Sequence, residues 1–178
     1  FPDLVFASNV EQSPNLPREP IKIGLGVMAY RGWRRDATIE TSYAGKLARF
    51  VENATMRGYH VEYLVAEPSD KRALANLPRP AANDDPFLRA ERMETLDDVM
   101  ATAASCHVVI GSRFHVLIAG LKMRRPCVSI SYGPKHDLLL EAAGIPKFCQ
   151  SADEFSVDQL VSDVEQILAD LPRYEHIV

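Results

Sequence analysis

Residues 106–145 read CHVVIGSRFHVLIAGLKMRRPCVSISYGPKHDLLLEAAGI. Two apolar runs of strand length, CHVVIG (106–111) and CVSISY (127–132), alternate with segments of helical spacing over 112–123 and 135–143, the second ended by Gly144. Strands without polar alternation are buried on both faces, and a helix after each strand returns the chain to the same edge. The stretch therefore predicts a parallel sheet with helices on both faces, a Rossmann-like α/β domain.

The same alternation occurs on both sides of this stretch. We expect strands over 21–30 and 59–66, and helices over 38–57, 69–76, 95–104 and 156–171. Gly58 should end the first of these helices, while Ser69 and Thr95 are the expected N-caps of the second and third. Residues 31–36 and 78–86 are expected to be loops, the latter broken by prolines.

Residues 13–20 contain three prolines, Pro14, Pro17 and Pro20, a composition that is typical of an exposed linker. The sequence starts at Phe1 rather than Met. We therefore expect residues 21–178 to form one Rossmann-like domain, and residues 1–20 to be a segment and linker that leave a preceding domain outside the sequence.

Composition excludes several classes of protein. The 178 residues carry a formal net charge of −4, which disfavours nucleic acid or an anionic membrane as the main partner. No apolar run approaches the roughly 18 residues of a membrane span. The three cysteines, Cys106, Cys127 and Cys149, lie far apart, so we expect reduced thiols and no metal site.

Ligands of an open parallel sheet bind outside the carboxyl ends of its strands. Many basic residues follow the predicted strands directly, namely Arg31, Arg34, Arg35, Arg113, Lys135 and His136. By contrast Lys122, Arg124 and Arg125 follow the carboxyl end of a predicted helix, where they complement the helix dipole and have a structural role. The sequence thus predicts an anion-binding edge.

The strongest candidate is the turn Gly111-Ser112-Arg113-Phe114-His115, where a strand meets a helix. Ser112 is the expected N-cap, and the free N–H groups behind it form an anion site. A cation in the first turn opposes the helix dipole by about 0.3–1 kcal/mol, so Arg113 is better explained by a bound anion than by stability. Imidazoles exchange protons near neutral pH, so His115 is a candidate acid. A surface arginine beside a core histidine is the alternative.

Other patterns carry less information. Gly24 and Gly26 imitate part of a dinucleotide fingerprint but fall inside a predicted strand. The histidines and cysteines lack zinc spacing, and no serine sits in a nucleophile elbow. His60 and His107 lie in or beside apolar strands and are expected to be packing residues.

The sequence resembles the polysaccharide pyruvyl transferase family. The resemblance rests on Arg113-Phe114-His115, Arg125-Pro126 and Tyr132-Gly133-Pro134-Lys135, which occur in the family's order and spacing, most sharply over residues 97–145. More loosely, residues 1–6 are similar to the segment that leaves the family's N-terminal domain, and residues 21–30 to the first strand of its C-terminal domain.

This resemblance implies the donor-side half of a glycosyltransferase-B-like enzyme that moves the pyruvyl group of phosphoenolpyruvate onto a sugar as a ketal. His115 would be the general acid and Arg113 its partner in catalysis. The implied substrate-binding residues are Ser112, Arg113, Phe114, His115, Tyr132, Lys135, Arg31, Arg34 and Arg35. No cofactor and no metal are expected, the acceptor would be a sugar or lipid-linked oligosaccharide, and the chain without its acceptor-binding half should be inactive.

Two other functions stay open at this point. The basic edge would also suit the nucleotide-sugar diphosphate of a glycosyltransferase, or a non-catalytic module that binds an anion. We expect a cytoplasmic location, with or without peripheral attachment to the inner face of the membrane. Apolar residues of the last helix, Leu160, Ile167 and Leu168, could face the domain's own core, another domain or another chain in an oligomer.

Overall fold

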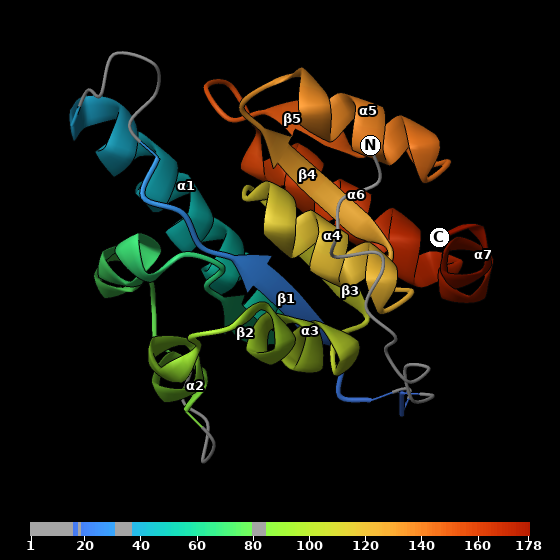
Figure 1. Cartoon of the computed structure of the whole chain (residues 1–178), viewed down its shortest axis with the longest axis horizontal. Helices are drawn as coiled ribbons and strands as arrows, with labels where there is room; N and C mark the ends of the chain where they lie inside the picture. Colours follow the sequence, from blue (N-terminus) through green and yellow to red (C-terminus); the bar gives the residue numbers. More distant parts are fainter. Residues whose placement is uncertain (1–15, 18, 31–36, 80–84) are drawn as a thin grey trace.

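The computed structural model describes residues 16–17, 19–30, 37–79 and 85–178. Its centre is a sheet of five parallel strands (Figure 1). The strands are β1 (Lys22–Gly26), β2 (His60–Leu64), β3 (Val108–Gly111), β4 (Cys127–Ser131) and β5 (Cys149–Ser151), in the order β2-β1-β3-β4-β5. The predicted Rossmann-like α/β arrangement is confirmed.

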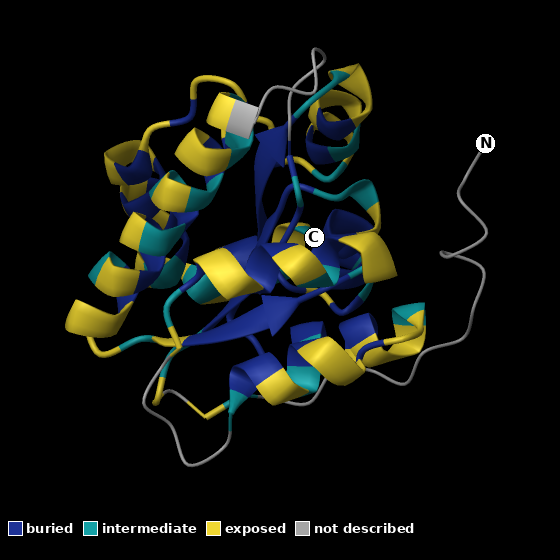
Figure 2. Ribbon diagram, turned by 90° about the vertical axis from the view of Figure 1, so that its left-hand side faces the viewer, coloured by how far each residue is buried: buried dark blue, intermediate teal, exposed yellow. Residues whose placement is uncertain are grey.

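Helices cover both faces of this sheet. On one face α1 (Ala37–Met56) packs against α6 (Val157–Ala169), and elsewhere α3 (Leu96–Ala104) packs against α4 (Phe114–Lys122). Right-handed crossovers put α3, α4 and α5 (Pro134–Ala142) on the face opposite α1. The helices turn their buried sides to the sheet, in which strands β1 to β4 are almost wholly buried (Figure 2). This double cover explains the uninterrupted apolar strands in the sequence.

Local signals placed most helix ends correctly. Gly58 and Gly144 have φ angles of 79° and 74°, the left-handed conformation expected after a helix. Thr95 caps α3 in a reciprocal arrangement: its hydroxyl accepts from the Asp98 N–H, while the Asp98 carboxylate accepts from the Thr95 N–H at 2.9 Å. These backbone and cap interactions depend on nearby residues only, which is why sequence was sufficient.

Some elements differ from the prediction. The expected helix over 69–76 is a 3-10 helix, η2 (Pro68–Asn76), and Ser69 lies inside it instead of capping it, because Pro68 already occupies the first position. Three further elements are additional: α2 (Pro86–Arg92), β5 and α7 (Leu171–Ile177). Both added helices begin with a proline in the first turn, and β5 is a short strand with the polar sequence CQS.

The amino edge of the sheet contains the residues for which a structural role was predicted. Arg125 is buried, donates to Glu175 Oε1 at 2.7 Å and to the Ala104 carbonyl at 2.9 Å, and so confirms that role. His107 is buried between the Lys22 N–H and the Pro17 carbonyl. The prediction is wrong for His60, which is exposed because it is the first residue of β2, at the rim of the sheet.

The last long helix faces its own domain. Leu160 and Ile167 on α6 are fully buried, and Leu168 packs against the same core. This settles the three alternatives for these side chains in favour of the domain's own core. The adjoining helix α7 contacts α6 and buries Tyr174 against Phe148, with ring centroids 5.4 Å apart.

The three cysteines and two of the glycines lie in or beside the strands of the sheet. Cys106, Cys127 and Cys149 are free thiols, and the first two are buried. Gly24 and Gly26 lie inside β1, where a Cβ on Gly26 would come within 3.0 Å of the Ile110 carbonyl oxygen.

Within the described ranges, no group of three acidic, histidine or cysteine side chains is arranged to hold a metal, and no helix has the length and apolar character of a membrane span.

Candidate active site

The strand order puts the topological switch point of the sheet, where a ligand-binding crevice is expected, between β1 and β3. From β1 the chain crosses through α1 to β2 on one side, and from β3 it crosses through α4 to β4 on the other. The two connections diverge at the carboxyl ends of neighbouring strands, which is where open α/β sheets bind ligands. Residues 27–30 leave β1 at this point, and Ser112 and Arg113 leave β3.

Arg113 is held at the crevice by a fully buried carboxylate, Asp70. The guanidinium donates through Nε to Asp70 Oδ2 at 2.7 Å and through Nη2 to Oδ1 at 2.8 Å. Asp70 Oδ1 also accepts the backbone N–H of Ala29, just after β1, at 3.0 Å. One carboxylate from η2 thus joins the exits of β1 and β3 and fixes the orientation of Arg113.

A second carboxylate, Glu67, reaches the same guanidinium, with Oε2 3.2 Å from Nη2. Its side chain is 43% exposed, whereas that of Arg113 is 20% exposed. The hydrogen bonds that Arg113 donates to Asp70 raise the pKa of Arg113, although burial acts in the opposite direction. The positive charge of Arg113 is therefore matched by two carboxylates, which the prediction of a purely basic edge did not include.

Asp70 and Glu67 are two acidic site residues that sequence reasoning missed. The available signal was their position: Glu67-Pro68-Ser69-Asp70 follows β2, the neighbour of β1, at the same edge as the other candidates. The pairing with Arg113 joins residues 43 positions apart in the chain. No local pattern indicates which acid would turn inward.

Ser112 does not cap α4, contrary to the prediction. The N-cap position is taken by Arg113, without a side-chain cap hydrogen bond. Ser112 is fully buried, and its hydroxyl instead shares a short hydrogen bond with the hydroxyl of Tyr43 from α1. The N–H groups in the first turn of a helix lack intrahelical acceptors, so this uncapped end retains donors that can face an anion.

His115 lies in the first turn of α4 and is exposed. Within the described part of the chain, its imidazole makes no hydrogen bond or ion pair. It is therefore not the satisfied core histidine of the alternative reading. An accessible imidazole on an uncapped helix end can exchange a proton with a ligand that binds there.

Phe114, Tyr132 and Lys135 come together beside this turn. The Lys135 ammonium lies 4.9 Å from the centroid of Phe114 and 5.4 Å from that of Tyr132. The Lys135 side chain is exposed, so its charge is accessible to a ligand that approaches from the solvent. Contacts of this kind are worth about 0.5–1 kcal/mol at an exposed position, enough to favour this placement without fixing it.

His136 connects the turn after β3 to the turn after β4. Its buried ring packs edge-on against Tyr132, and its nitrogens lie 3.2 Å from the carbonyl oxygens of Gly133 and Ser112. Burial lowers the pKa of His136, and the hydrogen bonds to the two carbonyls oppose that effect. A neutral imidazole has one N–H, so it donates to one of these carbonyls at a time.

Tyr30 follows β1 and lies beside two other tyrosines. Its hydroxyl donates to Asp153 Oδ1 at 2.7 Å, and its ring centroid lies 5.3 Å from that of Tyr43 and 6.5 Å from that of Tyr132. Burial, with help from Asp153, raises the pKa of Tyr30 to about 12. Three predicted binding residues, Arg31, Arg34 and Arg35, lie outside the described residues, so their position relative to this site stays a prediction.

Comparison with known proteins identifies a family for this chain. Residues 1–134 match a sequence model of the polysaccharide pyruvyl transferase family, a range that includes Asp70, Arg113, His115 and Tyr132. Comparison with curated proteins gives no match, and comparison with solved structures gives none either. The family match covers most of the chain. The chain therefore belongs to the polysaccharide pyruvyl transferase family.

Proposed function

We propose that this chain is the donor-binding, C-terminal half of a glycosyltransferase-B-like enzyme that transfers the pyruvyl group of phosphoenolpyruvate to a sugar, forming a ketal. The observation that carries the proposal is the position of Arg113 and His115 on the uncapped end of α4, at the crevice between β1 and β3. An oriented guanidinium, free N–H groups and an accessible imidazole converge there, which suits a small anionic donor.

The donor's anionic groups would bind at the N-terminus of α4 and at Lys135, with the remaining N–H groups of Arg113 directing them. Because Asp70 and Glu67 balance the charge of Arg113, its part in binding is mainly directional. Most of the electrostatic attraction would then come from Lys135, the helix end and the arginines at 31, 34 and 35. Ser112 would shape the turn through Tyr43, and Phe114 and Tyr132 would hold Lys135 in place.

In the proposed reaction His115 gives a proton to the methylene carbon of phosphoenolpyruvate, which becomes a methyl group while positive charge develops at C2. One sugar hydroxyl forms a bond to C2, a second hydroxyl displaces the phosphate, and the two hydroxyl protons leave. One restores His115 and the other goes to the departing phosphate. The products are the pyruvate ketal and inorganic phosphate.

Calorimetric titration of the chain tests the donor assignment. Phosphoenolpyruvate should bind and a nucleotide diphosphate sugar should not; the reverse result would favour a glycosyltransferase. His115→Ala should keep most of the donor affinity, since the proposed role of His115 is proton transfer, whereas Lys135→Ala should lose most of it.

Turnover is measured in an enzyme that also has the acceptor-binding half. His115→Ala should reduce the rate by about 10²- to 10⁴-fold, the usual contribution of a general acid. Near-normal turnover by this variant would exclude the acid role. Binding of phosphoenolpyruvate without any pyruvylated sugar, even in that enzyme, would favour a non-catalytic module.

A further inference from the structure

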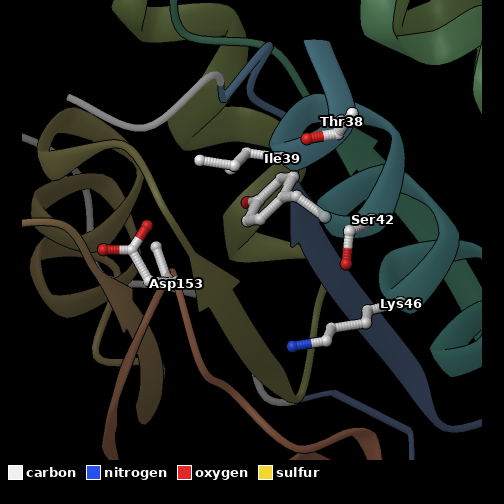
Figure 3. A pocket seen from close by; sticks show the side chains of 7 residues that line it. Thr38, Ile39, Ser42, Lys46 and Asp153 are labelled. Atoms are coloured by element: carbon white, nitrogen blue, oxygen red, sulfur yellow. The ribbon is translucent and has the colours of Figure 1, made fainter. Parts of the chain in front are cut away.

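Two adjoining pockets lie at the same edge of the sheet as Arg113, on the side of β4 and β5. The first, of about 540 Å³, separates α1 from the turn after β5. In Figure 3, Thr38, Ser42 and Lys46 project from α1 and Asp153 faces them from the other wall. The second, of about 420 Å³, lies over the carboxyl ends of β4 and β5. Asp153 lines both, and we name the combined surface the Asp153 trough.

The trough is rich in hydrogen-bond acceptors and hydroxyl groups. Asp137 and Asp153 contribute carboxylates, while Thr38, Ser42 and Ser151 contribute hydroxyls. Asp153 uses Oδ1 to accept from Tyr30; within the described chain Oδ2 accepts no hydrogen bond, and the residue is exposed. An acceptor set of this kind suits a ligand that brings many hydroxyl donors.

Charge argues against an anion in the trough. Two carboxylates face it, and the lysine that lines it, Lys46, has its ammonium 4.8 Å above the ring of Phe155. A ligand with a phosphate and a carboxylate would meet repulsion from Asp137 and Asp153. The trough therefore differs in electrostatic character from the turn of residues 111–115, which we name the Arg113 turn, although both lie at one edge of the sheet.

Tyrosines join the trough to the Arg113 turn. Tyr132 lines the second pocket and, through its contact with His136, lies beside the start of α4. Tyr43 lines the first pocket, and its hydroxyl bonds to Ser112, the residue before Arg113. A ligand in the trough would therefore be adjacent to one held at the helix end.

From these observations we infer that the Asp153 trough binds a neutral pyranose of the acceptor, with sugar hydroxyls donating to Asp153 Oδ2 and the apolar face of the sugar ring against Tyr132. The inference rests on the proposed function, because a ketal transfer requires two sugar hydroxyls beside the donor. It goes further by giving this chain a part of the acceptor site. The combined pockets are also in the roughly 300–1,000 Å³ range of small-molecule sites.

Ligand-observed saturation-transfer NMR on the chain tests the inference. The probes are the methyl pyranosides of glucose, galactose and mannose, together with the methyl glucuronide that carries an added carboxylate. At least one neutral glycoside should bind in the millimolar range, and the glucuronide about tenfold more weakly because of Asp137 and Asp153. Asp153→Asn should weaken the binding of the neutral glycoside about fivefold. It should also reduce the ratio of the affinity for the neutral glycoside to the affinity for the glucuronide.

Matched variants separate a site from a general effect on the fold. Glu154→Gln changes the adjacent exposed acid, which does not line the trough, and should leave binding unchanged. Ser42→Tyr fills the first pocket and should abolish glycoside binding, whereas Arg49→Tyr, two turns further along α1, should not. Absence of binding by all three neutral glycosides, or equal losses in Asp153→Asn and Glu154→Gln, would overturn the inference.

Phosphoenolpyruvate is titrated into the same samples, so that the two proposals can fail separately. Asp153→Asn should retain donor affinity within about twofold, since the donor is assigned to the helix end. Glycoside binding without donor binding would reject the proposed function and leave a sugar site. Loss of donor binding in Asp153→Asn would show that the trough belongs to the donor and would overturn the inference.

Discussion

An arginine paired with a carboxylate lies at each terminus of α4, but the two arginines differ in burial and in their relation to the helix dipole. Arg125, beyond the carboxyl end, complements the helix dipole and is buried against Glu175 and the Ala104 carbonyl. Arg113, at the amino end, opposes the dipole, retains 20% of its exposure and faces the crevice. Arg125 is therefore paired in the interior of the fold, whereas Asp70 holds Arg113 at a position that a ligand can reach.

The largest expected effect comes from removing the buried acid at the amino end. Asp70→Ala leaves the Arg113 guanidinium and the Ala29 N–H without their main acceptor, so we expect the free energy of unfolding to fall by about 3–5 kcal/mol. Urea denaturation measures this loss. Glu67→Ala, which removes the more exposed acid from the same guanidinium, is the control and should cost under about 1 kcal/mol. Equal losses of unfolding free energy in the two variants would contradict the expectation that Asp70 stabilises the fold more than Glu67 does.

At the carboxyl end, Arg125→Met should reduce the free energy of unfolding by about 2–3 kcal/mol. The variant leaves Glu175 and the Ala104 carbonyl without this donor but retains an apolar side chain in the space. Denaturation gives the loss, and calorimetry with phosphoenolpyruvate should give unchanged donor affinity. A change in donor affinity would mean that the two ends of α4 are not independent.

A smaller effect, of opposite sign, is expected at the exposed acid. Glu67→Gln removes a negative charge beside Arg113 while Asp70 still holds the guanidinium, so phosphoenolpyruvate should bind about two- to fivefold more tightly. Titration calorimetry checks this, with Glu94→Gln, an exposed acid on another loop, as the comparison. Weaker donor binding would show that Glu67 assists the donor instead of competing with it.

The smallest effect should appear as a pH dependence at the amino end. Because burial lowers the pKa of His136 in the folded chain, the unfolded chain binds more protons below neutrality. The contribution of this residue to stability is therefore present above the ordinary histidine pKa of about 6.5 and is lost as the pH falls. His136→Gln should flatten the decline in unfolding free energy between pH 7 and pH 5. An unchanged slope would place the pH dependence elsewhere.

Local sequence was sufficient wherever the structure depends on neighbouring residues. The strand runs, the helix ends at Gly58 and Gly144 and the capping box of Thr95 all follow from backbone preferences and short-range hydrogen bonds. The elements that were missed depend on packing instead. The short strand β5 pairs with β4 although its sequence is polar, and α2 and α7 are short helices that have a proline in the first turn and pack on existing elements.

The candidate site divides in the same way. Arg113, His115 and Lys135 were predicted from their positions after strands, since parallel strands bring all their carboxyl ends to one edge. Phe114 and Tyr132 were implied as binding residues only by the family resemblance. Ser112 belongs to the turn but bonds to Tyr43 instead of capping the helix. Asp70, Glu67 and Asp153 were not predicted, because many exposed acids follow strands and helices in this acidic chain.

By itself, the sequence determined the fold class and the family resemblance, and it placed the candidate site residues at one edge of the sheet. These follow from the periodicity and order of residues along the chain, which the amino-acid sequence contains directly. Tertiary structure alone decided that Asp70 holds Arg113, that His136 lies beneath the turn and that Asp153 closes a trough of acceptors. Such pairings join residues tens of positions apart, and they are selected by burial, because a buried charge or N–H group requires a partner in space.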